Sequence, residues 1–379
     1  MAFPAEFGLA TACCRWPPSS ARDESVSKAA TGVDWEHFLR VARRHRVEAL
    51  AEDALRRAGV AVPAKVAKKL LADARTIVSL NLVFAAEARR VSDLLTAEGI
   101  RHLFLKGLTL NMLAYGSLGL KRSCDIDLLV DPEQYGAACD TLAASGYYCV
   151  LPGRSVSRRD LLEFAEAEKD TSWQHQTRPV KVELHQRLLA NPLLLPGVGL
   201  SSPTQTVEIA SGVRLETLAK EELFAYLCAH GALTAWSRLK WLADLCALLK
   251  NDDPAEIERL YRRTQRDFPC RAAAAALLLG HRLLALPLSR ELVAELERDG
   301  MTRWLVRMAL GTMLQGDAAT ELHEKPMGTW RIHASIFFLE GGWRYKCSEV
   351  KRKFKVVKAR RILLLDALRR PPRSAAGPA

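Results

Sequence analysis

Two aspartates alternate with hydrophobic residues in segment 125–130, Asp-Ile-Asp-Leu-Leu-Val, and this pattern constrains the fold more than any other part of the sequence. Its period of two and its branched residues predict a β-strand. Residues i and i+2 of a strand face the same side, about 7 Å apart, so Asp125 and Asp127 can converge on one metal ion. Because neighbouring carboxylates repel each other, a cation such as Mg²⁺ is expected there. In an isolated Asp-x-Asp pattern, an exposed edge strand is the commoner explanation.

Two further segments favour the metal site. The apolar run 103–105 stops at Lys106-Gly107, before a helix-compatible segment whose first amides can bind an anion. Segment 180–185 predicts another strand, with Glu183 and His185 on one face. Three acids near a glycine turn are typical of a two-metal site for phosphoryl or nucleotidyl transfer. Lys106 adds positive charge for a triphosphate, and a surface lysine at a strand end is the alternative.

The order and spacing of these motifs resemble the polymerase-β type nucleotidyltransferase superfamily. More closely, they resemble a bacterial branch described as uncharacterised nucleotidyltransferase, over residues 34–250. The matching motifs are Leu105-Lys-Gly107, Tyr115-Gly116, Arg122, Asp125 to Val130, Val182-Glu-Leu-His185 and Leu239-Lys-Trp-Leu-Ala-Asp244. The resemblance implies an α+β fold, in which a small mixed-sheet, polymerase-β-like domain is flanked by N- and C-terminal helical regions.

The resemblance also implies a role for each site residue. Three acids would be catalytic and would hold two Mg²⁺ ions, with Mn²⁺ as a substitute, and the phosphates of an NTP would be bound by a second group. The acids are Asp125, Asp127 and Glu183, and the nucleotide-binding residues are Lys106, Gly107, Arg122 and Lys240. Glu183 would ligate the ion that activates the attacking hydroxyl, and is also a candidate acceptor for its proton.

Four site residues keep two interpretations each. Arg122 either binds a phosphate or tethers the two aspartates when no metal is bound. His185 either hydrogen-bonds within the site or transfers protons. Lys240 and Asp244 are i,i+4 neighbours on a helix that the resemblance places over the nucleotide. Lys240 would contact a phosphate and Asp244 would fix Lys240 or contact the acceptor; the alternative is a solvent-exposed ion pair.

Segment composition predicts five regions. They are a poorly ordered leader (1–33), an N-terminal helical region (34–98) that begins at an Asp34 N-cap, the catalytic domain (99–215), a C-terminal helical domain (216–322) and a basic C-terminal segment (323–379). Within the fourth region we expect a helix that ends at Gly231, and three helices over 253–310. His45 is expected to pack or cap rather than to catalyse.

Charge and cysteine content limit the partners and the compartment. The net charge is +12, and much of the excess lies in 346–373, which is either a solvated face or a contact for a polyanion such as RNA or anionic lipid. Nine cysteines without C-x-x-C spacing predict reduced thiols. With no apolar stretch of about 18 residues, the protein is expected to be cytoplasmic.

Together these observations predict an enzyme that moves a nucleoside monophosphate from an NTP to an acceptor, with release of pyrophosphate. The alternative is a nucleotide- or RNA-binding module that retains the fold without turnover. Three clustered acids favour the enzyme, because a module without catalysis has no use for them. The sequence leaves open whether the acceptor is a small molecule, a protein or an RNA.

Overall fold

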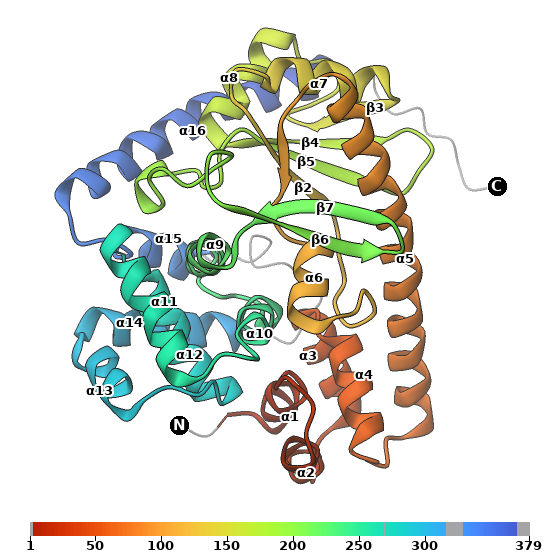
Figure 1. Ribbon diagram of the computed structural model, residues 1–379, viewed down its shortest axis with the longest axis vertical. Coiled ribbons are helices and arrows are strands. Elements are labelled where there is room, and N and C mark those ends of the chain that lie inside the picture. Colours follow the sequence, from red (N-terminus) through yellow and green to blue (C-terminus); the bar gives the residue numbers. More distant parts are fainter. Residues whose placement is uncertain (1–2, 269, 316–328, 370–379) are drawn as a thin grey trace.

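The computed structural model describes residues 3–268, 270–315 and 329–369 (Figure 1). These residues form a five-stranded mixed sheet, a two-stranded sheet and helices on either side of them in the sequence. The α+β fold class with helical flanks is therefore confirmed. Figure 1 shows the long helix α5 running along one side of the molecule, from the N-terminal helices up to the sheet.

The N-terminal region is helical from its start. Its helices are α1 (Ala5–Cys13), α2 (Ser20–Ala29), α3 (Trp35–His45), α4 (Glu48–Arg57) and α5 (Ala64–Ala97). Asp34 caps α3 as expected, accepting hydrogen bonds from the amides of Glu36 and His37. The expectation of a poorly ordered leader is wrong, because α1 buries Phe7 and Leu9 in the same core as the later helices. Burial of these apolar residues orders the segment, although a Pro- and Ser-rich stretch follows them.

The main sheet has the strand order β1-β2-β5-β4-β3. Its strands are β1 (His102–Phe104), β2 (Ile126–Val130), β3 (Tyr147–Leu151), β4 (Asp170–His175) and β5 (Lys181–His185), and the helices between them are α6 (Leu108–Tyr115), α7 (Tyr135–Ala144) and α8 (Arg158–Glu168). Only the pair β2–β5 is parallel, and its register places Asp127 opposite Glu183. The parallel pair therefore carries two of the three predicted acids, Asp127 and Glu183, side by side.

Alternation along β2 separates two hydrophobic cores. Ile126 and Leu128 face a core built with α5, α7 and α8, and Val182 of β5 joins them there. Leu129 faces the other core, which contains the N-terminal helices and the C-terminal helical half. Asp127 lies between these apolar residues in sequence and points to the same side as Leu129. The acid face of the sheet is thus covered by helices from both ends of the chain.

The C-terminal half of the chain follows β5 and includes the two-stranded sheet. Its elements are η1 (Pro192–Leu194), β6 (Thr204–Ala210), β7 (Val213–Leu218), α9 (Lys220–Leu233), α10 (Leu239–Leu248), α11 (Pro254–Asp267), α12 (Ala272–Leu284), α13 (Arg290–Arg298), α14 (Gly300–Met313), α15 (Trp330–Phe337) and α16 (Trp343–Arg369). Two expectations are wrong here. Gly231 lies inside α9, and the region 253–310 contains four helices, because the Asp299 side chain caps α14 directly after α13 ends.

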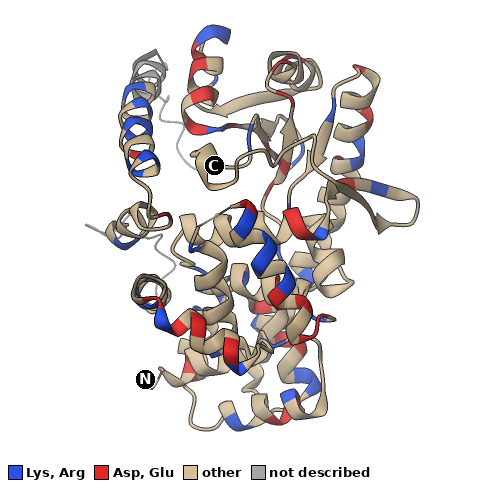
Figure 2. Ribbon diagram, turned by 60° about the vertical axis from the view of Figure 1, so that its left-hand side comes forward, with Lys and Arg blue, Asp and Glu red and all other residues tan. Residues whose placement is uncertain are grey.

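The basic C-terminal segment includes α16, along which Figure 2 shows Lys and Arg residues. Lys355 and Lys358 of this helix pair with Glu166 and Glu163 of α8 at 3.6 and 3.8 Å. Part of its positive charge is therefore used within the molecule. Contact with a polyanion stays a prediction, and residues 323–328 and 370–379 of this segment lie outside the described residues. Nowhere in the described ranges does a helix combine the length and apolar character of a membrane span.

His45 joins the two helical regions. Its imidazole is 2% exposed, and its Nδ1 accepts a hydrogen bond of 3.0 Å from the amide of Leu239, the first residue of α10. The packing and capping role expected for His45 is confirmed. Burial, reinforced by the charges of Arg44 and Arg238, lowers the pKa of His45 to about 3.

This histidine is expected to make folding stability depend on pH. Its folded-state pKa lies below the unfolded value of about 6.5, so protonation favours the unfolded chain, and stability falls as the pH drops from 6.5 towards 3. At pH 5 the loss is about 2 kcal/mol. Urea unfolding at pH 7.5 and 5 measures it. His45→Asn keeps an acceptor near Nδ1 but does not titrate, and should lose less stability over this range. Equal losses in both proteins would contradict this role.

Candidate active site

The Lys106-Gly107 turn connects the end of β1 to the start of α6. Gly107 precedes the helix with φ +70°, a conformation that L side chains rarely adopt. A Cβ there would meet only the backbone oxygen of Asp125 and Oγ of Ser123, at 3.7 and 3.8 Å, so the backbone conformation is what calls for glycine. The turn directs the first amides of α6 and the Lys106 side chain towards the start of β2.

Asp127 is the most enclosed acid of the site. Its side chain is 1% exposed; Oδ2 accepts a hydrogen bond of 2.6 Å from Nζ of Lys106, and Oδ1 lies 3.2 Å from Nε2 of His185. Although burial favours the neutral form, Lys106 and the hydrogen bond from His185 hold the pKa of Asp127 well below its usual range. Asp127 therefore stays ionised, and its charge raises the pKa of Lys106 in turn.

Glu183 lies directly across the parallel pair from Asp127. Its Oε1 accepts a hydrogen bond of 2.6 Å from Lys181, and its Oε2 lies 4.0 Å from Nε2 of His185. Within the part of the chain that the structure describes, Asp127, Glu183 and His185 form the group whose possible metal-ligand atoms all lie within 4.8 Å of one another. Two carboxylate oxygens and an imidazole nitrogen are donors that fit a divalent cation.

Asp125 is placed differently from Asp127. It directly precedes β2, which begins at Ile126, and its carboxylate is not part of that group of three. Burial, and then the charge of Asp127, raise the pKa of Asp125 to about 6. Asp125 is thus half-buried at the start of β2, whereas Asp127 is fully buried within the site.

Asn81 of α5 positions the loop that enters β2. Its amide nitrogen donates to the carbonyls of Leu118 and Lys121, at 2.5 and 2.7 Å, and its oxygen accepts from the amide of Ser123 at 3.0 Å. Arg122 on this loop is exposed. Because Asp127 pairs instead with Lys106 and His185, a tether from Arg122 to that aspartate is not formed.

Helix α10 covers the site, but Asp244 has other partners than expected. Asp244 is 3% exposed, and its two oxygens bind Tyr115 and Lys121 at 3.0 and 2.9 Å. The solvent-exposed pair with Lys240 is therefore wrong, because Asp244 turns into the core and fixes α10 to α6. Burial, and then the charge of Lys121, lower the pKa of Lys240 to about 8.

A small cavity of about 40 Å³ lies at the centre of this arrangement. It brings together most of the residues that the sequence singled out, namely Lys106, Gly107, Arg122, Asp125, Asp127, Lys240 and Asp244. Leu227 and His230 of α9 and Trp241 of α10 close its other side. Glu183 and His185 adjoin this cavity, because both lie close to Asp127, which lines it.

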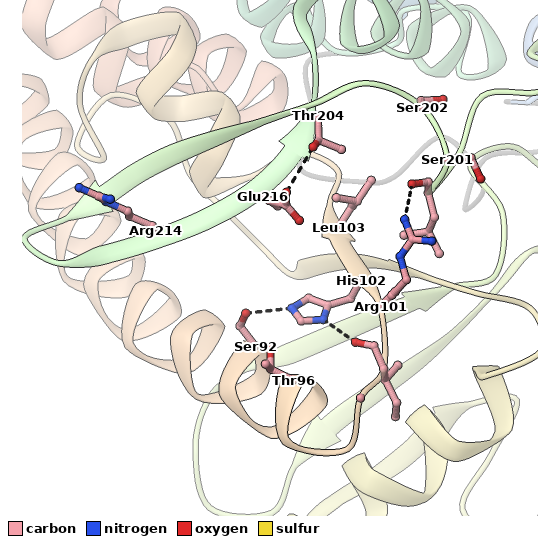
Figure 3. Close-up of a pocket in the computed structure, with 13 residues that line it drawn as sticks. Ser92, Thr96, Arg101, His102, Leu103, Ser201, Ser202, Thr204, Arg214 and Glu216 are labelled. Atoms are coloured by element: carbon pink, nitrogen blue, oxygen red, sulfur yellow. Dashed lines mark hydrogen bonds between the residues drawn. The ribbon is translucent and has the colours of Figure 1, made fainter.

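A larger cavity of about 570 Å³ lies at the other end of β1 (Figure 3). His102 in its wall pairs with Val130, whereas the backbone amide of Leu105 reaches Asp127, so the cavity and the acids lie at opposite ends of β2. The ring nitrogens of His102 lie 2.8 Å from Oγ of Ser92 and 3.0 Å from the carbonyl of Ile100. One nitrogen thus joins β1 to α5 and the other binds the loop before β1, which explains this histidine without catalysis.

Several residues of the site were not foreseen. Ser123 is 4% exposed, yet its Oγ has no hydrogen-bond partner among the described residues. Lys169 and Asp170 both approach His185 from the start of β4. The signal for Asp170 is the hairpin that joins β4 to β5, whose register pairs this residue with His185. For Ser123 the sequence holds no such signal, because its burial depends on Asn81, 42 residues earlier.

Comparison with known families agrees with this geometry. A family model described as uncharacterised nucleotidyltransferase matches residues 31–285. Comparison with curated proteins finds no match. The matched residues include β1, β2 and β5, with their acids, and extend through α10 and α11. Because they make up more than half of its length, the chain belongs to this family of uncharacterised nucleotidyltransferases.

Proposed function

We propose that this nucleotidyltransferase moves a nucleoside monophosphate from an NTP to an acceptor by divalent-metal chemistry, and releases pyrophosphate. The observation that carries the proposal is the pairing of Asp127 with Glu183 across two parallel strands, beside the Lys106-Gly107 turn. Carboxylates facing each other next to a cationic turn supply both a metal site and a phosphate site. The donors fit Mg²⁺ or Mn²⁺, which when bound would neutralise phosphate charge and lower the pKa of the attacking hydroxyl.

The chain's own residues bind and orient the triphosphate in this proposal. Lys106, now held by Asp127, would turn its ammonium towards phosphate oxygens when the carboxylate charge is neutralised. The amides that follow Gly107 and the exposed guanidinium of Arg122 would add donors, and Lys240 lines the same cavity. Their common task is to place the α-phosphate in line with the acceptor.

The bond changes are those of a single displacement. The acceptor oxygen forms a bond to the α-phosphorus, and the bond from that phosphorus to the bridging oxygen of the β-phosphate breaks. Pyrophosphate takes the electron pair of the broken bond, and the acceptor proton passes to solvent. Since no covalent step involves the protein, positioning and charge neutralisation supply the rate.

The proposal requires the site to open. The cavity volume of about 40 Å³ is far below the several hundred Å³ that small-molecule ligands occupy. Helix α10 forms its wall, and the link from α9 to α10 contains Ala235 and Trp236, both with positive φ. This link is the candidate hinge, because residues in such conformations concentrate at functional segments.

Incubation of a cell extract with the purified protein and each NTP in turn, followed by mass spectrometry, tests the function. The expected result is a species whose mass increases by one nucleoside monophosphate, formed only when a divalent metal is present. If no NTP yields such a species in any extract while NTP binds without response to metal, the chain is a nucleotide-binding module instead.

Ser123 is expected to contribute to nucleotide affinity. Its buried hydroxyl has no hydrogen-bond partner in the described part of the chain and lies close to Gly107, where a phosphate oxygen would accept from it. Ser123→Ala should therefore weaken NTP binding about tenfold, since hydrogen bonds to charged groups contribute about 1.5 kcal/mol or more. It should also raise stability by up to about 1 kcal/mol, because an unsatisfied buried hydroxyl is removed. Calorimetry and urea unfolding measure the two effects.

Thr217→Val is the matched control for this substitution. Thr217 of β7 is fully buried, and its hydroxyl also lacks a partner within the described ranges. The control should raise stability without any change in NTP affinity. If Ser123→Ala binds NTP as tightly as the control does, Ser123 has no part in the phosphate site.

A further inference from the structure

We propose that His185 is itself a metal ligand, together with Asp127 and Glu183, and that Asp170 orients its imidazole for this task. This centre would have two oxygen donors and one nitrogen donor, and would prefer a first-row transition ion such as Mn²⁺ to Mg²⁺. The inference rests on the proposed function and specifies which metal that site takes. It assigns His185 to the metal rather than to proton transfer.

The positions of the three side chains support direct ligation. Nε2 of His185 lies 3.2 Å from Oδ1 of Asp127 and 4.0 Å from Oε2 of Glu183. Donor atoms about 2.1 Å from one ion, at right or tetrahedral angles, lie about 3 to 3.5 Å apart. The distance between His185 and Asp127 already fits this range, and the other donor atoms, all within 4.8 Å of one another, would move closer to share one ion. All three residues come from adjacent strands in fixed register, which favours a rigid site.

Asp170 supplies the outer contact that ligating histidines usually have. Its Oδ2 lies 3.5 Å from Nδ1 of His185, and the two residues are paired across β4 and β5. Metal-bound imidazoles commonly donate their second N–H to a carboxylate, which fixes the ring and its tautomer. With Nδ1–H directed at Asp170, the lone pair of Nε2 points to Asp127 and Glu183.

Lys169 favours the other tautomer of His185, in which the proton is on Nε2. Its Nζ lies 3.0 Å from Nδ1 of His185 and also binds Asp170. When Lys169 donates to Nδ1, the proton must sit on Nε2, and the imidazole donates to Asp127 instead of binding an ion. Lys169 directly follows α8 with φ +88°, an unusual conformation for a residue other than glycine. Metal binding therefore requires that Nδ1 of His185 donate to Asp170 rather than accept from Lys169.

The donor set determines the metal preference. Oxygen donors alone suit Mg²⁺, whereas imidazole nitrogen suits transition ions, which bind mixed sites more tightly. Mn²⁺ accepts both kinds of donor and is paramagnetic, so it serves as the probe. Its coupling to a directly bound imidazole nitrogen is visible by pulsed electron paramagnetic resonance, without any turnover.

The test is Mn²⁺ binding to the full chain without nucleotide. We expect a bound ion coupled to one imidazole nitrogen, and loss of that coupling in His185→Asn but not in His281→Asn, a histidine of α12 that binds the Leu286 carbonyl. Asp170→Asn should weaken Mn²⁺ binding about 10- to 100-fold. Lys169→Met should strengthen it, because a competing donor and a positive charge are removed. The proposal fails if bound Mn²⁺ shows no nitrogen coupling, or if Asp170→Asn binds it as wild type does.

These results separate two kinds of failure. Bound Mn²⁺ without nitrogen coupling, in a protein that still transfers nucleotide, means an all-oxygen centre: the histidine assignment falls and the proposed function stands. If Mn²⁺ does not bind, and Asp127→Asn transfers nucleotide as wild type does, both the histidine assignment and the proposed function fail. Retained coupling in His185→Asn would place the ion elsewhere and overturn the assignment as well.

Discussion

Asp127→Asn is expected to reduce nucleotidyl transfer at least about 10³-fold. The substitution removes the negative charge that would hold the metal ion, and with the ion the stabilisation of the transition state. Asparagine keeps the shape of the side chain and one accepting oxygen. Asp125 remains close enough to offset the charge of Lys106, so the chain should still fold. Transfer of label from NTP labelled at the α-phosphate, with Mg²⁺ or Mn²⁺, measures the loss, and circular dichroism checks the fold.

Asp131→Asn is the matched control, since Asp131 directly follows the other end of β2. Its Oδ1 accepts a hydrogen bond from the amide of Glu133, which asparagine can replace. This variant should keep wild-type transfer. Equal label transfer by wild type and Asp127→Asn would show that the pairing of Asp127 with Glu183 is not catalytic.

Gly231→Ala is expected to lower the free energy of unfolding by about 2–3 kcal/mol. A Cβ at Gly231 would lie 2.4 Å from two ring carbons of Trp236, a distance that no side chain tolerates. Trp236 is 2% exposed, and its amide donates to the Gly231 carbonyl at 2.8 Å, so the ring has little room to move. Relief of the clash would shift the link to α10, and with it Lys240. Urea unfolding at pH 7.5 measures the effect.

Gly8→Ala separates this clash from the ordinary cost of glycine in a helix. Gly8 lies inside α1, and a Cβ there would meet nothing within 4 Å. Alanine at this position should raise stability by about 0.5–1 kcal/mol, since glycine is a poor helix former. If Gly231→Ala were instead as stable as Gly8→Ala, the close packing of the Trp236 ring against Gly231 of α9 would be contradicted.

The parts of the fold that follow from local pattern could be predicted from the sequence. The alternation in 125–130 and 180–185 predicted both strands of the parallel pair, and Gly107 marked the start of α6. Glu183 could be predicted to share a face with His185 because side chains of period two face the same side of a strand. Its pairing with Asp127 alone, and not with Asp125, comes from the register of β2 and β5. The family resemblance added the order of the motifs, which isolated patterns cannot supply.

Tertiary contacts determined what the sequence could not show. Asp244 turns to Lys121, far away in sequence, because burial between α6 and α10 outweighs an i,i+4 contact of a few tenths of a kcal/mol. Gly231 resembles a helix end by residue type, but the ring of Trp236 is what requires glycine there. Residues 5–29 carry a leader-like composition, and only the core that they complete makes them helical.

Diffraction data collected at a wavelength where Mn²⁺ scatters anomalously, from crystals soaked with Mn²⁺ and a non-hydrolysable NTP, would test the metal-dependent nucleotide site most directly. We expect an anomalous peak in contact with the carboxylates of Asp127 and Glu183, with the triphosphate against Lys106 and the amides after Gly107. A triphosphate bound elsewhere, or bound at this turn with no peak at Asp127, would contradict it.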